Sequence, residues 1–398
     1  MIFNTWEFAL FGAIVLPAYW LFVPQRWKPY YLVAAGTVFY ACSVPAYLLL
    51  IFALAIITYG ASRVLTAPRT PPGTRKLVFT LAVVAIVAVL GFFKYMKLLA
   101  ATVDAIARHN VLPAPQIVVP LAISFFTFEF VHVLVDAYQG KLKSVDALDF
   151  AVFAMFFPTL VAGPIKRYES FAPQVLAIVP LERNELALNV YRIGIGLVKK
   201  IVLADSFSLL TQPILTPGAP YGRLDYWIAA VAYAGKIYFD FTGYSDIAIG
   251  IAGLLGLKIP ENFDRPYWAP NIGSFWRRWH MSLSSWIRDY IFIPLGGSRR
   301  PPAVVLLNLF VAMGIAGLWH GAAWTFVVWG LWHGLGLAVH RVWSKFVVPA
   351  VPMLRAGGPA VVAISIVATF AFVDAGWILF AATSFPNAAR VYQGLFTG

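Results

Sequence analysis

The sequence is poor in cysteine and in charged residues. One cysteine, Cys42, stands among 398 residues, which excludes a disulfide framework and a cysteine metal cluster and favours a small buried apolar role for it. Charged residues make up 12%, against about 25% in soluble domains. The sequence also lacks HExxH and GxxxxGK[ST] motifs, so neither a zinc site nor nucleotide hydrolysis is expected.

Apolar residues dominate what is present. They make up 61% of the chain, against roughly 45–50% in soluble domains, so membrane lipids surround most of the protein. Apolar stretches able to cross as helices of roughly 20 residues are expected at 8–23, 30–43, 46–61, 77–96, 118–135, 150–161, 186–203, 226–238, 247–257, 304–316, 322–340 and 360–382. Stretches 150–161 and 247–257 are short enough to be half-helices or re-entrant segments.

These stretches predict an all-α integral membrane protein that crosses about nine to eleven times, with additional interfacial and re-entrant helices. The first stretch has no basic region before it and reads as a retained helix, not a signal peptide. With no internal repeat and no shift in composition, residues 1–398 are predicted to form a single membrane-embedded domain.

The net charge of +13 is clustered. Positive-inside bias explains the clusters better than a nucleic-acid surface does, so no nucleic-acid partner is expected. The loop 63–76 carries four basic residues and no acid, which places it in the cytoplasm and the amino terminus outside.

His320 is the first candidate for chemistry. It lies in GLWHG at 317–321, between apolar stretch 304–316 and aromatic stretch 324–332. An ionisable group at such a place is a functional-site candidate. His109, His333 and His340 are interpreted as interfacial or packed.

Segment 271–300 is too charged to span a membrane. As a helix, it would carry Trp276, Trp279, Leu283, Trp286 and Tyr290 on one face. Arg277, His280, Ser284 and Arg288 would fall on the adjoining face. An interfacial helix satisfies both faces, and the arginines could neutralise a phosphate-bearing donor. The alternative is a surface helix that holds anionic lipid.

Two further polar groups lie on apolar helices. Glu129, His132 and Asp136 share one face, either lining a cavity or bracing helices through hydrogen bonds. Asp240 stands four residues after Lys236 and is followed by Tyr244 and Asp246. These residues either bind substrate or form a buried ion pair next to a capped helix start.

Ordered motifs in the chain resemble those of the membrane-bound O-acyltransferase (MBOAT) family, and most closely the bacterial branch that O-acetylates alginate. The matching segments are GFFKY at 91–95, ISFFTF at 123–128, FPTLVAGPI at 157–165, GLVKK at 196–200, FDFTGYSD at 239–246, ENF at 261–263, FWRRWH at 275–280, RDY at 288–290, PLGG at 294–297 and LWHG at 318–321.

The resemblance implies a multi-helix plate with a central tunnel, and it carries the family's catalytic histidine onto His320 and its second recurrent histidine onto His280. It also implies that one or two terminal helices of longer relatives are missing. His132 and Ala381 depart from the branch's pattern, which puts the acceptor polysaccharide and a lipid or partner contact in doubt.

The expected activity is acyl transfer in a bacterial inner membrane. His320 would take a proton from an acceptor hydroxyl as it attacks a thioester, with Trp319, Trp324 or a backbone amide near Gly321 stabilising the oxyanion. No bound cofactor is expected. Acetyl-CoA or another acyl thioester would be the donor, and a cell-surface polysaccharide or peptidoglycan the acceptor. The resemblance also implies a periplasmic SGNH-type acetyltransferase partner.

Two interpretations without chemistry remain. A transporter or flippase would use Glu129, His132, Asp136 and the Arg277 row as its pathway, although the two related halves typical of transporters are absent. A scaffold for a periplasmic acetyltransferase would not depend on His320.

Overall fold

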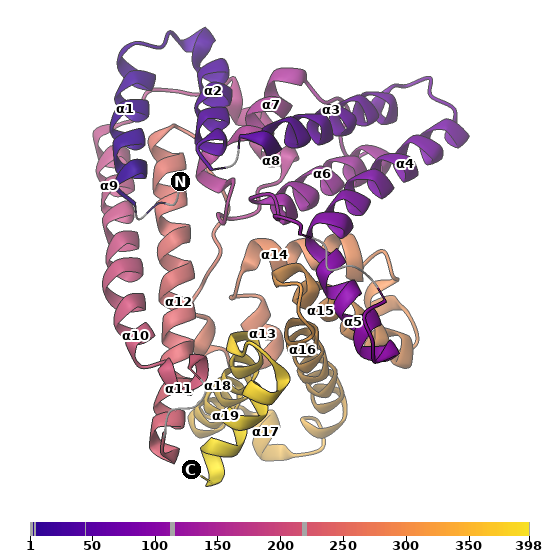
Figure 1. Cartoon of the computed structure of the whole chain (residues 1–398), viewed down its shortest axis with the longest axis vertical. Helices are drawn as coiled ribbons and strands as arrows, with labels where there is room; N and C mark the ends of the chain where they lie inside the picture. The colour runs from indigo at the N-terminus through magenta and orange to yellow at the C-terminus, as the bar shows by residue number, and fades with distance from the viewer. Residues whose placement is uncertain (1–2, 4, 44, 112–115, 217–220, 398) are drawn as a thin grey trace. The chain divides into compact units, whose positions relative to one another are not determined.

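The computed structural model describes residues 3, 5–43, 45–111, 116–216 and 221–397. These residues form helices and connecting loops and no strand, which confirms the all-α prediction (Figure 1). They divide into two compact units. Unit 1 comprises Met1–Leu197 and Tyr244–Pro260, and unit 2 comprises Val198–Gly243 and Glu261–Gly398.

Unit 1 packs around buried phenylalanines that include Phe39, Phe126 and Phe153. Its helices are α1 (Trp6–Leu21), α2 (Lys28–Ala41), α3 (Ala46–Thr66), α4 (Pro72–Leu90), α5 (Met96–Ala107), α6 (Ile123–Tyr138), α7 (Ala147–Met155), α8 (Tyr168–Val175) and α9 (Arg183–Leu197), with short turns η1 (Gln25–Trp27), η2 (Gly91–Tyr95) and η3 (Phe157–Thr159).

Unit 2 packs around buried aromatic residues that include Phe275, Trp329 and Trp377. Its elements are η4 (Val198–Ala204), α10 (Asp205–Leu209), α11 (Gln212–Leu215), η5 (Pro266–Trp268), α13 (Ile272–Trp276), α14 (Met281–Ile287), η6 (Arg288–Phe292), η7 (Gly297–Arg299), α15 (Pro302–His320), α16 (Trp324–Val342), η8 (Trp343–Val347), α17 (Pro352–Ala356), α18 (Pro359–Ala381) and α19 (Phe385–Thr397). Helix α12 (Arg223–Leu254) contributes to both units.

Among the described residues, four helices are long and apolar enough to cross a membrane: Ala46–Thr66, Pro72–Ala107, Pro302–His320 and Pro359–Ala381. The second runs for 36 residues because the π turn η2 joins α4 to α5. Stretch 150–161 forms only α7 and η3, so it is too short to span, as expected. The total of nine to eleven crossings stays a prediction.

Local sequence explains where several of these helices begin. Pro72, Pro302 and Pro359 occupy first-turn positions, where the missing N–H is not needed and the fixed φ suits a helix. Asp146 caps α7 by accepting hydrogen bonds from the amides of Leu148 and Asp149.

The prediction of two separate segments at 226–238 and 247–257 was wrong, because α12 runs unbroken from Arg223 to Leu254. Its polar stretch remains helical because tertiary partners satisfy the side chains. Asp240 pairs with Lys200 and Asp246 pairs with Arg192. Thr242 donates its hydroxyl to the carbonyl of Tyr238 one turn earlier.

The prediction of one continuous helix in 271–300 was also wrong. Helices α13 and α14 are separated at His280, whose φ of 44° is left-handed. The backbone here bonds to the segment preceding α13: the Asp264 amide donates to the carbonyl of Arg278, and the Met281 amide to the carbonyl of Asn262. These long-range bonds replace helical ones, which the spacing of aromatic residues could not show.

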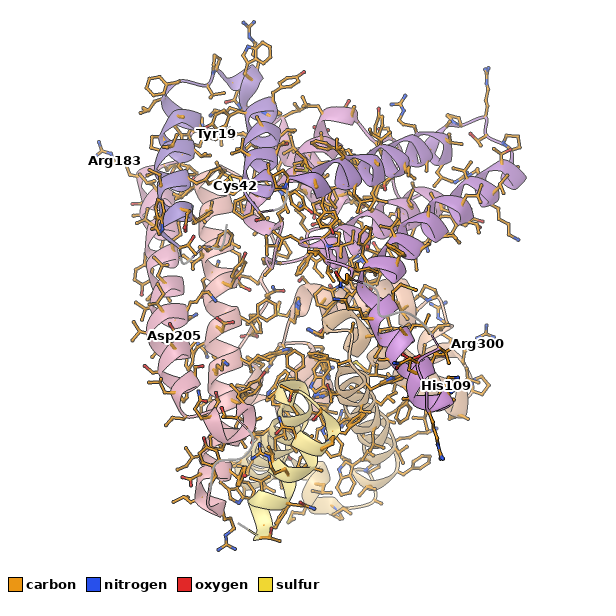
Figure 2. The ribbon with its side chains drawn as sticks, in the orientation of Figure 1. Tyr19, Cys42, His109, Arg183, Asp205 and Arg300 are labelled. Atoms are coloured by element: carbon orange, nitrogen blue, oxygen red, sulfur yellow. The ribbon has the colours of Figure 1, made fainter. Side chains whose placement is uncertain are left out.

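Cys42 was expected to be buried, but it is exposed at the end of α2 (Figure 2). Its thiol therefore lies at the surface of the chain and not in a packed core.

Candidate functional site

Helices α15 and α16 form a tightly packed hairpin in unit 2. A Cβ added at Gly317 would lie 2.1 Å from the carbonyl oxygen of Phe326, and one at Gly330 would lie 2.1 Å from that of Met313. Only glycine permits this approach. Gly321, in extended conformation, ends α15 directly after His320.

His320 is half-buried at the carboxyl end of α15. Its ring centroid lies 5.0 Å from that of Trp319, 5.1 Å from Trp329 and 5.2 Å from Phe380. The His280 ring lies 6.3 Å away. The imidazole thus sits in an aromatic surrounding, with a second histidine as its neighbour.

His280 is held by its backbone and by Asn262. Its left-handed conformation is uncommon for a residue other than glycine, and such strain concentrates at functional positions. The Nδ1 atom lies 3.3 Å from Oδ1 of Asn262, which also accepts from the amide and the hydroxyl of Ser282 at 3.3 Å and 2.6 Å.

This arrangement decides which nitrogen of His280 carries the proton. Oδ1 of Asn262 is an acceptor, so Nδ1 donates and Nε2 keeps its lone pair. Nε2 is buried without a hydrogen-bond partner among the described residues. Burial, and secondarily the neighbouring His320, lower the pKa of His280 well below its ordinary value. His280 is therefore neutral, and its Nε2 presents a lone pair that can accept a hydrogen bond.

The other predicted members of the His280 row make separate contacts. Arg277 is exposed and donates to the Ser274 hydroxyl at 2.8 Å. Arg288 is exposed and pairs with Asp289 at 2.8 Å. Ser284 donates its hydroxyl to the carbonyl of Trp279. The break at His280 removes the shared helical face on which the row depended.

Trp319 is buried and its ring contacts those of both histidines, whereas Trp324 is 48% exposed at the start of α16. Sequence reasoning missed Asn262, Trp329 and Phe380 around this site. It also treated His333 as ordinary packing, although both of its ring nitrogens are buried without partners among the described residues. The ENF motif contained Asn262, but no local pattern assigned its role.

Glu129 and His132 have partners inside unit 1. Glu129 pairs with Lys166 at 2.6 Å, and both are almost fully buried. Nε2 of the buried His132 accepts from the Tyr168 amide at 3.1 Å. Asp136 pairs with Lys141 at 3.0 Å. These bonds supply the polar contacts that a brace between segments requires.

The residues of the α12 group are divided between the units. Asp240 pairs with Lys200, not with Lys236, in unit 2. In unit 1, the ring of Tyr244 stacks on that of Phe3 at 4.4 Å, and Asp246 pairs with Arg192 at 3.0 Å.

Comparison with known proteins gives a consistent result. The sequence profile of the membrane-bound O-acyltransferase family matches residues 73–373. The chain is 35% identical to the probable alginate O-acetylase AlgI of Azotobacter vinelandii over 402 residues, covering 100% of the chain and 78% of the relative. It is 34% identical to the peptidoglycan O-acetyltransferase of Helicobacter pylori over 94% of the chain and 73% of the relative. The teichoic acid D-alanyltransferase of Streptococcus thermophilus is 32% identical over 56% of the chain and 57% of its own length.

Proposed function

The chain belongs to the membrane-bound O-acyltransferase family and is an O-acyltransferase, and from that premise we propose that it moves an acetyl group from a thioester to a cell-surface polysaccharide, with His320 as the general base. The named activities of the relatives, on alginate and on peptidoglycan, support this acceptor class. D-alanyl transfer to teichoic acid is the activity of a more distant relative.

The observation that carries the proposal is the setting of His320. A half-buried imidazole at the end of a membrane-spanning helix, surrounded by aromatic rings and next to the neutral His280, suits proton transfer in a water-poor site. His320 takes the proton from the acceptor hydroxyl while the oxygen of that hydroxyl attacks the thioester carbonyl. The carbon–sulfur bond then breaks, and the leaving thiolate receives the proton from His320.

Three groups are the proposed oxyanion donors: the indoles of Trp319 and Trp324 and a backbone amide near Gly321. Trp319 has the strongest support because its ring contacts that of His320. His280 would position the hydroxyl through its unpaired Nε2.

We place the protein in a bacterial cytoplasmic membrane, with the donor on the cytoplasmic side and the acceptor outside. The acyl group passes either directly to sugar or first to a separate periplasmic SGNH-type protein. Arg277, Arg288 and Ser284, together with Asp240, Tyr244 and Asp246, stay candidates for substrate contacts. For Glu129 and His132, the contacts in unit 1 favour a bracing role.

The test uses purified protein in nanodiscs with acetyl-CoA labelled in the acetyl group. The wild type is compared with His320→Ala and with His109→Ala, a control in which an exposed histidine is removed. We expect His320→Ala to lose at least about 100-fold in label transfer, the lower range for a general base, while His109→Ala retains it. Equal transfer by wild type and His320→Ala would refute the proposal and support a scaffold or a transporter.

A further inference from the structure

A hollow of about 630 Å³ in unit 2 is lined by Asp264, Arg265, Trp268 and Arg278. Its volume falls in the range of small-molecule sites, roughly 300–1,000 Å³. Asp264, Arg265 and Trp268 are exposed to solvent, and Trp268 is 68% exposed. Two cationic groups and a flat aromatic ring therefore face one open space.

The two arginine charges of this hollow are not neutralised within the described part of the chain. Neither the guanidinium group of Arg265 nor that of Arg278 forms an ion pair there. Arg265 is held in a left-handed conformation, with φ of 45° directly before Pro266. A bulky residue in this conformation is strained, and strain of this kind concentrates at ligand sites.

The hollow is joined by backbone to the candidate active site. The hydrogen bond from the Asp264 amide to the carbonyl of Arg278 closes its rim. Three residues after Arg278 and two residues before Asp264, the Met281 amide donates to the carbonyl of Asn262. The side chain of Asn262 contacts His280, whose ring neighbours that of His320. A ligand bound here would need a long arm to reach the imidazole.

We propose that this hollow binds the nucleotide end of a coenzyme A thioester, an inference that rests on the proposed use of a thioester donor. The two guanidinium groups bind phosphates. The indole of Trp268 stacks on the adenine, as aromatic rings do with bases. Asp264 accepts hydrogen bonds from ribose hydroxyls or the adenine amino group. A carboxylate that faces the site suits a nucleotide better than an anionic lipid headgroup or free phosphate.

Binding is measured first, without chemistry. Equilibrium dialysis of labelled adenosine 3′,5′-bisphosphate against His320→Ala protein in nanodiscs compares the parent with versions that also carry Arg265→Gln, Arg278→Gln or Trp268→Leu. Arg299→Gln removes an exposed arginine of the same unit as the matched control. We expect each variant at the hollow to weaken binding about 10-fold, and the control to leave it unchanged.

Kinetics with two donors then separate the site from the reaction. In otherwise wild-type protein, Arg265→Gln and Arg278→Gln should raise KM for acetyl-CoA about 10-fold with kcat retained. KM for S-acetyl-pantetheine, which lacks the nucleotide, should not change. Unaltered acetyl-CoA kinetics in the variants would overturn the site while leaving acyl transfer intact.

Two other outcomes also overturn the assignment. Nucleotide binding that is equal in the parent and all variants places the nucleotide elsewhere. An effect of the variants that appears only when the nanodiscs contain phosphatidylglycerol identifies a lipid headgroup site. If no thioester supports transfer but the bisphosphate binds as expected, the proposed function fails and the nucleotide site stands.

Discussion

The buried pair between Glu129 and Lys166 offers a quantitative test of whether this part of α6 braces the fold or binds substrate. The Oε1 and Nζ atoms are 2.6 Å apart. The residues are 4% and 1% exposed, and the Lys166 ammonium lies 4.4 Å from the centre of the Phe153 ring. Removing one partner leaves the other charge buried and unpaired.

Glu129→Leu and Lys166→Met are therefore each expected to lower the free energy of unfolding by about 3–5 kcal/mol. The double variant replaces the pair by apolar side chains of similar volume and should recover most of that loss. The control is Arg288→Met, which breaks the pair with Asp289. The two side chains are 63% and 31% exposed, so loss of this pair should change stability by no more than about 1 kcal/mol.

The assay is unfolding in mixed detergent micelles, followed by acyl transfer per folded molecule. A brace predicts that the double variant is stable and keeps its transfer activity. A double variant as unstable as the single ones would contradict the reasoning. A stable double variant that has lost transfer would instead identify Glu129 and Lys166 as substrate contacts.

Two further predictions concern the α15–α16 hairpin and His280. Gly317→Ala should destabilise the protein by about 1–3 kcal/mol and reduce acyl transfer, because the added Cβ would lie 2.1 Å from the Phe326 carbonyl oxygen. Gly314→Ala is the control and should be tolerated, since the nearest neighbour of its Cβ would be a Leu331 methyl at 3.5 Å. Thermal stability and activity are measured for both, and equal effects would refute the packing argument. Folding lowers the pKa of His280 below its ordinary value of 6.5. Below about pH 6.5, the unfolded chain therefore binds a proton at His280 that the folded protein does not bind, so the free energy of unfolding should decrease as the pH falls. His280→Asn, which tolerates a left-handed φ, should flatten the stability–pH curve in that range, and an unchanged slope would contradict the assignment.

The sequence predicted the helical segments well where one physical requirement governed them. A backbone in lipid must satisfy its own hydrogen bonds, so long apolar stretches become helices. Stretch 304–316 accordingly lies within α15, and stretch 360–382 matches α18 except for its last residue, which caps the helix. His320 stood out for the same reason, since an ionisable side chain is rare in such surroundings.

Prediction failed where polar residues found partners far along the chain. The polar part of α12 was expected to interrupt a helix, but Lys200 and Arg192 satisfy its carboxylates and the helix continues. The aromatic spacing in 271–300 favoured one helix, but backbone bonds to residues 262–264 break it at His280. Local patterns contain no information about such pairings.

The sequence by itself therefore determined the helical class, the membrane environment and the family, and it singled out His320 as the candidate for catalysis, because each depends on composition, on periodicity or on motifs read in order. Only the tertiary structure decided what surrounds that histidine. Residues distant in sequence make the contacts that matter here. Asn262 fixes the neutral tautomer of His280, the rings of Trp329 and Phe380 contact that of His320, and Glu129 pairs with Lys166. Their chemistry depends on distances and burial, which exist only after the chain has folded.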